Sequence, residues 1–304
     1  MPRVAYLGPR GTFSQAALIE MAALGILSGG AEELDTSSTP GALEAVRNGA
    51  AEYACVPIEN SIEGSVLPTL DSLAFGRPLQ IFGELTLDVA FSIVVAEHTT
   101  ADDVRRVAAF PMAAAQVQRW LAAHLPNAAI VAASSNAAAA EDVVAGRADA
   151  GVSTALAAEL YGLASLADGV VDEPNARTRF VLAGPPGAPP ERTGADRTSV
   201  VLRLDNVPGA LVSAMTEFAV RDIDLTRIES RPTRTELGTY VFFLDCVGHI
   251  DDTPVSEALK ALHRRCADVR YLGSWPTGSP VGAVPPSTDE ASSWLERLRK
   301  GERP

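Results

Sequence analysis

One short segment of this sequence limits the fold more than any other. Residues 183–196 (AGPPGAPPERTGAD) hold four prolines and three glycines. Proline has no backbone N–H to donate, and glycine adds no side chain to a core. The segment therefore cannot supply a full hydrogen-bond ladder and indicates an inter-domain linker. A chain of 304 residues has room for two or three domains, so we expect separate domains on its two sides.

The sequence before the linker alternates short apolar runs with helical stretches. Residues 4–8 (VAYLG) and 53–58 (YACVPI) predict buried strands. Thr12 is placed to cap a helix whose third position is Gln15, and residues 179–184 (RFVLAG) predict a closing strand. Such alternation is typical of βαβ units in an α/β fold.

Further elements are expected before the linker. Residues 40–47 predict a helix with proline in its first turn, and residues 81–95 are mostly extended. Three strand-and-helix pairs follow, at 104–110 with 112–124, at 128–134 with 136–145, and at 148–153 with 154–161.

The pattern changes after the linker. Strands are predicted at 198–204, 223–232, 239–248 and 268–275, and helices at 209–220 and 255–267. The order βαββαβ in about 80 residues indicates a ferredoxin-like domain. We expect the tail, residues 277–304, to be mostly mobile, with one short amphipathic piece at 292–300.

Charge and composition exclude several classes of function. The 25 Lys and Arg against 38 Asp and Glu give a net charge of −13, which disfavours nucleic acid and anionic membranes as partners. An anionic substrate must therefore be held by local donors. No apolar stretch is long enough for a membrane span, and the N-terminus lacks the apolar region of a secretory signal.

The cysteines and histidines suggest no reactive or metal centre. Cys55, Cys246 and Cys266 are odd in number and widely spaced, so we expect buried thiols in a reducing cytosol. The four histidines form no cluster with ligand spacing, and no metal site is expected.

Three polar patches lie where strands end. GPRGTFS (8–14) joins a strand to a capped helix, whose free N–H groups suit a carboxylate or phosphate. It lacks the Gly-Lys-Ser/Thr ending of a P-loop and the GxGxxG fingerprint. VPIENS (56–61) and NARTRF (175–180) add an amide, hydroxyls, a carboxylate and a guanidinium. Taken singly, the first patch is also compatible with an ordinary strand-to-helix turn, the second with a solvated loop, and the third with a structural strand edge.

The three patches together narrow the chemistry. None contains a His, Cys or Lys, so serine-type, thiol and Schiff-base catalysis lack support. The remaining hydroxyls, amide, Glu and Arg suit a small dicarboxylate whose reaction needs little acid or base catalysis.

The order of the motifs resembles a known family. GPRGTFS, VPIENSIEGSV, GELTL (83–87) and TRF (178–180) are similar to the dehydratase domain of prephenate dehydratases. VPGALVSAM (207–215) and IESRP (228–232) resemble an ACT regulatory domain. The resemblance spans residues 2–276 and implies a cytosolic, cofactor-independent enzyme that converts prephenate to phenylpyruvate, water and CO2. It also implies feedback inhibition by L-phenylalanine and assembly as a homodimer or a dimer-of-dimers tetramer.

The resemblance implies a domain layout. Residues 1–182 would form a two-lobed α/β catalytic domain of the periplasmic-binding-protein type, with the active site between the lobes. Lobe one would hold residues 2–80 and 165–182, and lobe two residues 81–164. Residues 183–196 would be the linker, and residues 197–276 the ACT domain.

The resemblance also implies residue roles. Thr178 would donate a proton or hydrogen bond to the leaving hydroxyl group. Arg179 would contact a carboxylate of the substrate or, alternatively, pair structurally within the protein. The expected substrate-binding residues are Gly11, Thr12, Glu59, Asn60, Ser61 and Phe180. The expected phenylalanine-binding residues are Asn206, Gly209, Ala210, Leu211, Val212, Glu229, Ser230, Arg231 and Pro232, which in the family meet across a dimer interface.

The chain departs from the family pattern at three positions. Phe91 and Phe110 stand where the family often has histidine, so a mechanism that needs those imidazoles fails here. Ala176 stands two residues before Thr178, where the family usually has Asn; Asn175 comes one residue earlier.

Three alternatives stay open. Arogenate dehydratase uses the amino analogue of prephenate on the same scaffold, and sequence cannot separate the two. A non-catalytic amino-acid sensor could use the same two-lobed fold and ACT module. The second half could also be a purely structural ferredoxin-like module.

Overall fold

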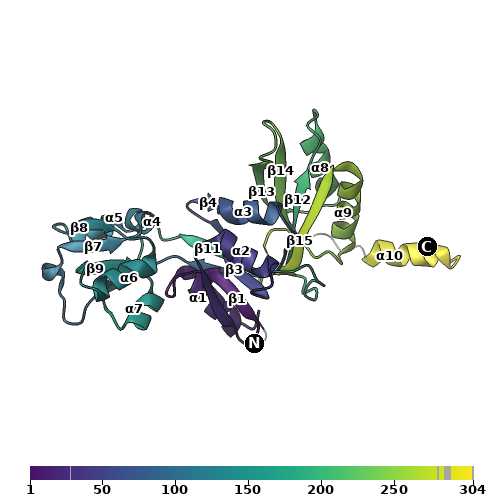
Figure 1. Cartoon of the computed structure of the whole chain (residues 1–304). Helices are drawn as coiled ribbons and strands as arrows, with labels where there is room; N and C mark the ends of the chain where they lie inside the picture. Colours follow the sequence, from purple (N-terminus) through teal and green to yellow (C-terminus); the bar gives the residue numbers. More distant parts are fainter. Residues whose placement is uncertain (28, 279–280, 284–288, 303–304) are drawn as a thin grey trace. The chain divides into compact units, whose positions relative to one another are not determined.

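The computed structural model describes residues 1–27, 29–278, 281–283 and 289–302. The chain forms two compact units. The first holds residues 1–72 and 85–185, and the second holds residues 73–84 and 186–304 (Figure 1). The boundary therefore falls inside one strand, β5 (Gln80–Asp88), between Glu84 and Leu85.

The first sheet has the strand order β2-β1-β3-β11-β5, with β4 paired to β3. β1 is parallel to β2 and β3, and β11 is antiparallel to β3. The strands are β1 (Arg3–Leu7), β2 (Glu32–Thr36), β3 (Tyr53–Asn60), β4 (Gly64–Ser65) and β11 (Arg177–Gly184), and the helices are α1 (Phe13–Ala23), α2 (Thr39–Arg47) and α3 (Leu67–Ala74). The α/β alternation is confirmed. The sequence pattern assigns Glu59 and Asn60 to a loop, but both belong to β3.

The local sequence explains how the first helices start. Thr12 caps α1, and its hydroxyl oxygen accepts a hydrogen bond from the backbone N–H of Gln15. Ser38 caps α2 in the same way, and Pro40 lies in the first turn, where a helix needs no N–H donor. α1 packs on the sheet through a core of Val4, Tyr6, Ala17, Leu18, Met21, Cys55, Phe180 and Leu182.

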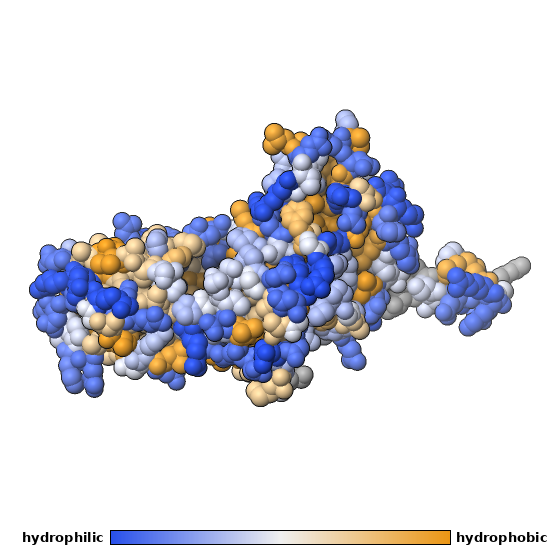
Figure 2. Space-filling view, viewed as in Figure 1, coloured by the Kyte–Doolittle hydropathy of each residue, from blue (hydrophilic) through white to orange (hydrophobic). Residues whose placement is uncertain are grey.

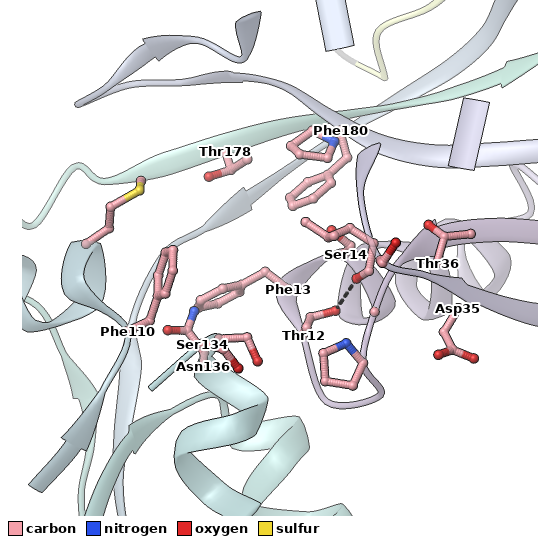
Figure 3. Close-up of a pocket in the computed structure, with 17 residues that line it drawn as sticks. Thr12, Phe13, Ser14, Asp35, Thr36, Phe110, Ser134, Asn136, Thr178 and Phe180 are labelled. Atoms are coloured by element: carbon pink, nitrogen blue, oxygen red, sulfur yellow. Dashed lines mark hydrogen bonds between the residues drawn. The ribbon is translucent and has the colours of Figure 1, made fainter. Parts of the chain in front are cut away.

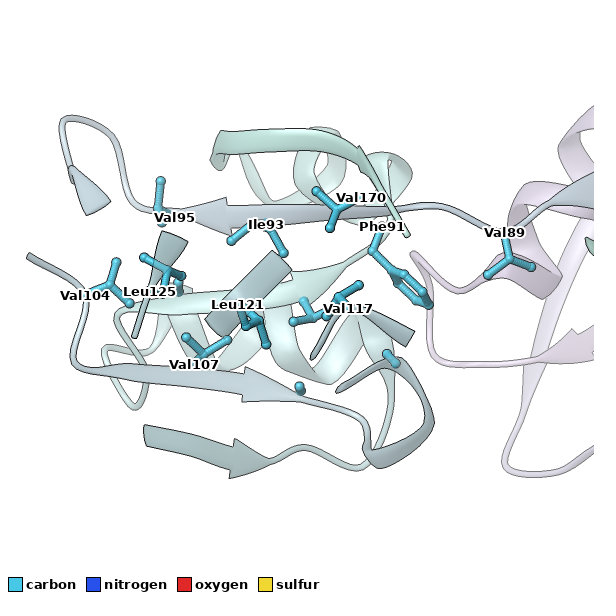
Figure 4. Packing of buried hydrophobic residues seen from close by; sticks show 14 of the residues in the cluster. Val89, Phe91, Ile93, Val95, Val104, Val107, Val117, Leu121, Leu125 and Val170 are labelled. Carbon is cyan, nitrogen blue, oxygen red and sulfur yellow. The ribbon is translucent and has the colours of Figure 1, made fainter. Parts of the chain in front are cut away.

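The second sheet of the first unit has the order β10-β6-β9-β7-β8. Its strands are β6 (Phe91–Val95), β7 (Arg106–Ala109), β8 (Ala129–Ala132), β9 (Ala150–Ser153) and β10 (Ala164–Val170). Its helices are η1 (Ala101–Asp103), α4 (Pro111–Gln116), α5 (Gln118–His124), α6 (Asn136–Val144) and α7 (Ala155–Tyr161). Figure 4 shows Val117 and Leu121 packed with Phe91, Ile93 and Val107 in this core.

Two features of this sheet differ from the sequence prediction. The helix expected over 112–124 is broken at Val117, whose φ and ψ of −127° and 15° are not helical. The lobe boundaries also move, because β5 belongs to the first sheet and β10 pairs with β6 in the second. Most residues of β10 are at least partly exposed, so the strand lacks the apolar pattern that would predict it.

The second unit contains the predicted ferredoxin-like arrangement, which is confirmed. All neighbouring strands are antiparallel in the order β13-β14-β12-β15. The elements are β12 (Asp196–Arg203), α8 (Ala210–Ala219), β13 (Leu225–Pro232), β14 (Tyr240–Val247), α9 (Thr253–Arg265) and β15 (Asp268–Pro276). Helices α8 and α9 bury one face of the sheet, around Val200, Leu202, Phe218, Leu244 and Leu262.

The tail includes a further helix, α10 (Asp289–Arg299). Its apolar side chains Trp294, Leu295 and Leu298 are partly exposed beside charged neighbours (Figure 2). Residues 279–280, 284–288 and 303–304 of the expected mobile tail lie outside the described residues. Each helix within the described ranges is too short or too polar to cross a membrane.

Candidate active site

A cavity of about 610 Å³ opens among elements of both sheets of the first unit (Figure 3). The β1–α1 turn, the end of β2, β3, β11 and the starts of α4 and α6 all contribute. The lining residues are Leu7, Gly8, Pro9, Thr12, Phe13, Ser14, Asp35, Thr36, Ser37, Pro57, Phe110, Met112, Ser134, Ser135, Asn136, Thr178 and Phe180. Three of the predicted site residues, Thr12, Thr178 and Phe180, are among them.

Thr178 lies opposite Asn60 in the antiparallel β3–β11 ladder. The side-chain nitrogen of Asn60 donates a hydrogen bond of 2.9 Å to the hydroxyl oxygen of Thr178. The other end of the Asn60 amide accepts the backbone N–H groups of Ile62 and Glu63 at 2.8 and 3.0 Å. These two donors require the amide oxygen on their side, so the NH2 group must face Thr178. Thr178 oxygen therefore acts as an acceptor here, and its hydroxyl hydrogen can be directed elsewhere.

Arg179 is not among the residues that line the cavity, and its ion pair matches the alternative of structural pairing. Successive side chains of a strand point to opposite faces, so Thr178 facing the cavity sends Arg179 away from it. The Arg179 side chain is 9% exposed, and its guanidinium lies 3.0 Å from the carboxylate of Glu59, the residue opposite it on β3. A bulge follows Arg179 in the ladder, beside Phe180, which also lines the cavity. Glu59 likewise faces Arg179 rather than the cavity.

Gly11 and Ser61 also lie outside the cavity lining. The N–H of Gly11 donates to the Gln15 side chain at 2.5 Å, and its carbonyl accepts from Thr154 at 2.6 Å. Both backbone groups are thus occupied within the protein. Gly11 has a φ of +87°, and a Cβ there would lie 2.9 Å from that of Ala157, so glycine permits the close approach of α7.

Ser61 fixes the segment that leads into Thr178. Its hydroxyl donates to the Asn175 carbonyl at 2.9 Å and accepts the N–H of Arg177 at 2.8 Å. Ser61 and Asn60 therefore form a frame around Thr178, and neither lines the cavity.

The start of α6 is a part of the cavity that the sequence reading did not single out. Ser134, Ser135 and Asn136 line it, and the Ser135 hydroxyl caps α6 by accepting from Ala138 N–H at 3.0 Å. Serine before an alanine-rich run is a readable cap signal. α1 starts at the same cavity, so two helix N-termini, one from each sheet, bring partial positive charge to it.

The cavity wall is poor in ionisable groups. Among the described lining residues, Asp35 alone has an ionisable side chain, and Figure 3 shows it well separated from Thr178. Phe110 lines the wall, and Phe91 is buried edge-on against Phe13, with ring centroids 5.6 Å apart. Burial raises the pKa of the Cys55 thiol to about 12, so this cysteine stays protonated. The arrangement offers hydrogen bonds and helix dipoles rather than strong acids or bases.

Two smaller cavities flank the start of α8 in the second unit. One, of about 240 Å³, is lined by Gly209 and Ala210, and the other, of about 150 Å³, by Asn206, Ala210 and Leu211. Of the remaining predicted residues, Val212 is 69% exposed and lines neither cavity. Glu229, Ser230, Arg231 and Pro232 lie on the edge strand β13 and do not join these cavities within one chain.

Within the described part of the chain, no three His, Cys, Asp or Glu side chains are grouped as metal ligands.

Comparison with known proteins assigns both halves. The family model described as prephenate dehydratase matches residues 4–187, and the ACT domain model matches residues 198–264. A prephenate dehydratase of Mycobacterium sp. (strain JLS) is 72% identical over 307 residues, which cover 99% of this chain and 97% of that protein.

Two solved structures are similar over most of the chain. Prephenate dehydratase from Arthrobacter aurescens in complex with L-Phe has a TM-score of 0.87 and 39% identity, covering 98% of this chain and 100% of that one. A structure described as GqqA, a novel type of quorum quenching acylase, has a TM-score of 0.79 and 30% identity, covering 91% and 98% of the two chains.

Proposed function

The chain belongs to the prephenate dehydratase family, and on that premise we propose that prephenate reacts in the cavity of the first unit, where Thr178 donates a hydrogen bond to the leaving hydroxyl group. The enzyme is a carbon–oxygen lyase. The observation that carries the assignment of Thr178 is its contact with Asn60. That contact occupies the Thr178 oxygen as an acceptor and leaves its hydrogen for the substrate.

The reaction needs only modest help from the protein. The electron pair of the bond to the lost carboxylate enters the ring, CO2 departs, and the bond to the hydroxyl group breaks with its electron pair on oxygen. A proton, supplied in net terms by solvent, completes the water molecule. Aromatisation drives these steps, so a hydrogen bond that strengthens as charge develops on the leaving oxygen is sufficient.

The two helix N-termini suit the two carboxylates of prephenate. The start of α1 presents Phe13 and Ser14, and the start of α6 presents Ser134 and Asn136. Free N–H groups at such positions bind anions without a cationic side chain. This matters in a protein with a net charge of −13. We assign Thr12 to the substrate side of α1 and Phe180 to the apolar wall.

The other predicted residues take supporting roles in this proposal. Asn60 orients the Thr178 hydroxyl, and Ser61 holds the segment before it. The ion pair of Arg179 with Glu59 fixes β11 from the opposite face. Gly11 permits α7 to approach the β1–α1 turn.

A direct assay tests the reaction. Purified enzyme is incubated with prephenate, and phenylpyruvate is measured by its absorbance in alkali. Absence of product at micromolar enzyme would contradict the proposal and favour an amino-acid sensor that binds without turnover. Parallel assays with arogenate determine which of the two substrates the enzyme prefers.

The acylase neighbour suggests a second activity, which the cavity does not favour. Hydrolysis by a hydroxyl nucleophile requires a base beside it. The described lining residues include several hydroxyl groups but no His or Lys.

Feedback inhibition by L-phenylalanine at the second unit is the regulatory part of the proposal. The ACT domain match and the L-Phe complex of the Arthrobacter enzyme support it. We assign the carboxylate of phenylalanine to the start of α8, at Gly209 and Ala210, and the second wall to Glu229–Pro232 of another subunit. Such a shared site requires a homodimer or a dimer-based tetramer, and light scattering measures the oligomeric state. We place the enzyme in the cytosol. Turnover measured with and without phenylalanine tests the inhibition.

A further inference from the structure

The last residue of β5 that belongs to the second unit is Glu84, and its carboxylate is buried. Glu84 accepts a hydrogen bond of 2.6 Å from the guanidinium of Arg197 on β12 and one of 3.0 Å from the indole of Trp275 on β15. The side chains of Glu84 and Arg197 are only 7% and 8% exposed, and Trp275 is fully buried.

A second buried ion pair lies on the same face of the sheet. Arg227 on β13 binds Asp245 on β14 through two hydrogen bonds, of 2.9 and 3.1 Å, and their side chains are 6% and 1% exposed. Asp245 is opposite Ser199 on β12, two residues from Arg197 and therefore on the same face as Arg197. The two pairs together extend across β13, β14 and β12 to β5, on the face opposite α8 and α9.

Buried ion pairs seldom add net stability. The desolvation of two charges can exceed their attraction, and apolar replacements of similar volume are often equally stable. Two such pairs on one face of this small sheet therefore suggest a role in defining one arrangement of the strands rather than in holding them together.

The two ends of this array are connected along the chain to residues of the two proposed sites. Arg227 precedes the segment Glu229–Pro232 on the same strand by two residues. At the other end, β5 continues from Glu84 to Asp88, a distance of about 13 Å along an extended strand. The Asp88 carboxylate accepts a hydrogen bond of 2.7 Å from Arg177, the residue before Thr178.

We propose that the pairs Arg227–Asp245 and Glu84–Arg197 couple the effector site to Thr178 through β5. This inference rests on the feedback inhibition proposed above. A shift of β13 on phenylalanine binding changes the geometry of the Arg227–Asp245 ion pair. This change then alters the geometry of the Arg197–Glu84 ion pair on the same face. β5 is one continuous strand, so it transmits the displacement of Glu84 to Asp88 and Arg177. Phenylalanine inhibits by this route only if it binds the two strand arrangements with different affinity.

The test uses a full-length double variant, Glu84→Gln with Arg197→Met. It removes both charges of this pair together, keeps an acceptor for Trp275, and replaces Arg197 with an unbranched side chain. The matched control is Asp142→Asn with Arg147→Met, which removes an ion pair of 2.6 Å between helix α6 and the turn that follows it in the first unit. Each protein is assayed for phenylpyruvate formation with and without phenylalanine, and for phenylalanine binding by calorimetry.

The double variant should bind phenylalanine with wild-type affinity and retain its basal turnover. Its inhibition should weaken by at least about fivefold, the lower end of usual allosteric coupling. The control should behave as wild type. Undiminished inhibition of the double variant would overturn the inference, as would loss of phenylalanine binding, which would make the pairs part of the effector site. A wild-type enzyme that phenylalanine does not slow would overturn the feedback proposal itself.

Discussion

The side-chain nitrogen of Asn60 lies 2.9 Å from the hydroxyl oxygen of Thr178, on the neighbouring strand of the first sheet. A hydroxyl group has one hydrogen, and this contact does not use it. In the proposed reaction the pair would work as a unit, in which Thr178 donates to the substrate and Asn60 determines where that donor points.

Thr178→Ala should lower turnover by at least about a hundredfold, because one hydrogen bond to the developing charge is lost. The half-buried side chain is small, so the melting temperature should change little. Thr178→Ser keeps the hydroxyl group and should retain much of the activity. Wild-type turnover in the alanine variant would contradict the donor role.

Asn60→Asp is nearly isosteric but reverses the polarity of the contact with Thr178. A carboxylate cannot donate, so it would accept the Thr178 hydrogen and remove it from the substrate. We expect a loss in kcat of about a hundredfold or more, with circular dichroism unchanged. Asn48→Asp makes the same chemical change in an exposed loop and serves as the control.

Arg179→Met should affect stability more than substrate binding. The guanidinium is buried and pairs with Glu59, so its loss should lower the free energy of unfolding by about 1–3 kcal/mol, measured by urea titration. KM for prephenate should stay within about threefold of wild type. A large rise in KM with normal stability would instead indicate that Arg179 contacts a carboxylate.

Gly11→Ala should destabilise the first unit through two effects. The φ of +87° disfavours alanine, and the new Cβ would lie 2.9 Å from that of Ala157. Gly162→Ala has a φ of +63° but nothing within 4 Å of its Cβ, so it should show the backbone effect alone, about 1–2 kcal/mol. Thermal denaturation of both variants measures the difference. Equal losses would show that the approach of α7 imposes no constraint.

The pH profile should reflect the absence of imidazole among the described residues that line the cavity. Burial raises the pKa values of Tyr6 and Cys55 to about 12, so neither group changes charge near neutrality. Turnover should therefore be nearly flat from about pH 6 to 8. Phe110→His introduces a group with an ordinary pKa of about 6.5. Its cation should lower KM for the dianionic substrate below that pH, and the benefit should vanish as the pH rises through it.

Much of the fold could be predicted because its signals are local. The Thr12–Gln15 cap, the strand at Tyr53 and the βαββαβ order after the linker depend on nearby residues and were all found in the structure. β10 could not be predicted, because this largely exposed strand is defined by its partner β6 rather than by an apolar pattern.

The site was less predictable than the fold for a similar reason. The sequence identifies Thr178 as a candidate, but it cannot reveal that the neighbouring Arg179 faces Glu59 on the other side of the strand. Whether adjacent strand residues share a cavity depends on the register and on the bulge after Arg179, which are long-range properties. Ser134–Asn136 carried a readable cap signal, but their meeting with α1 depends on the tertiary fold.

The boundary inside β5 has a consequence for protein engineering and for the history of such enzymes. Residues 73–84 belong to the regulatory unit although they precede most of the catalytic one in sequence. A truncation or chimaera made at the proline-rich linker would therefore divide that unit and separate Glu84 from the native Arg197 and Trp275. Any recombination that exchanges the regulatory module intact must carry this twelve-residue insert with it, so three crossovers in the gene are needed where the linker suggests one.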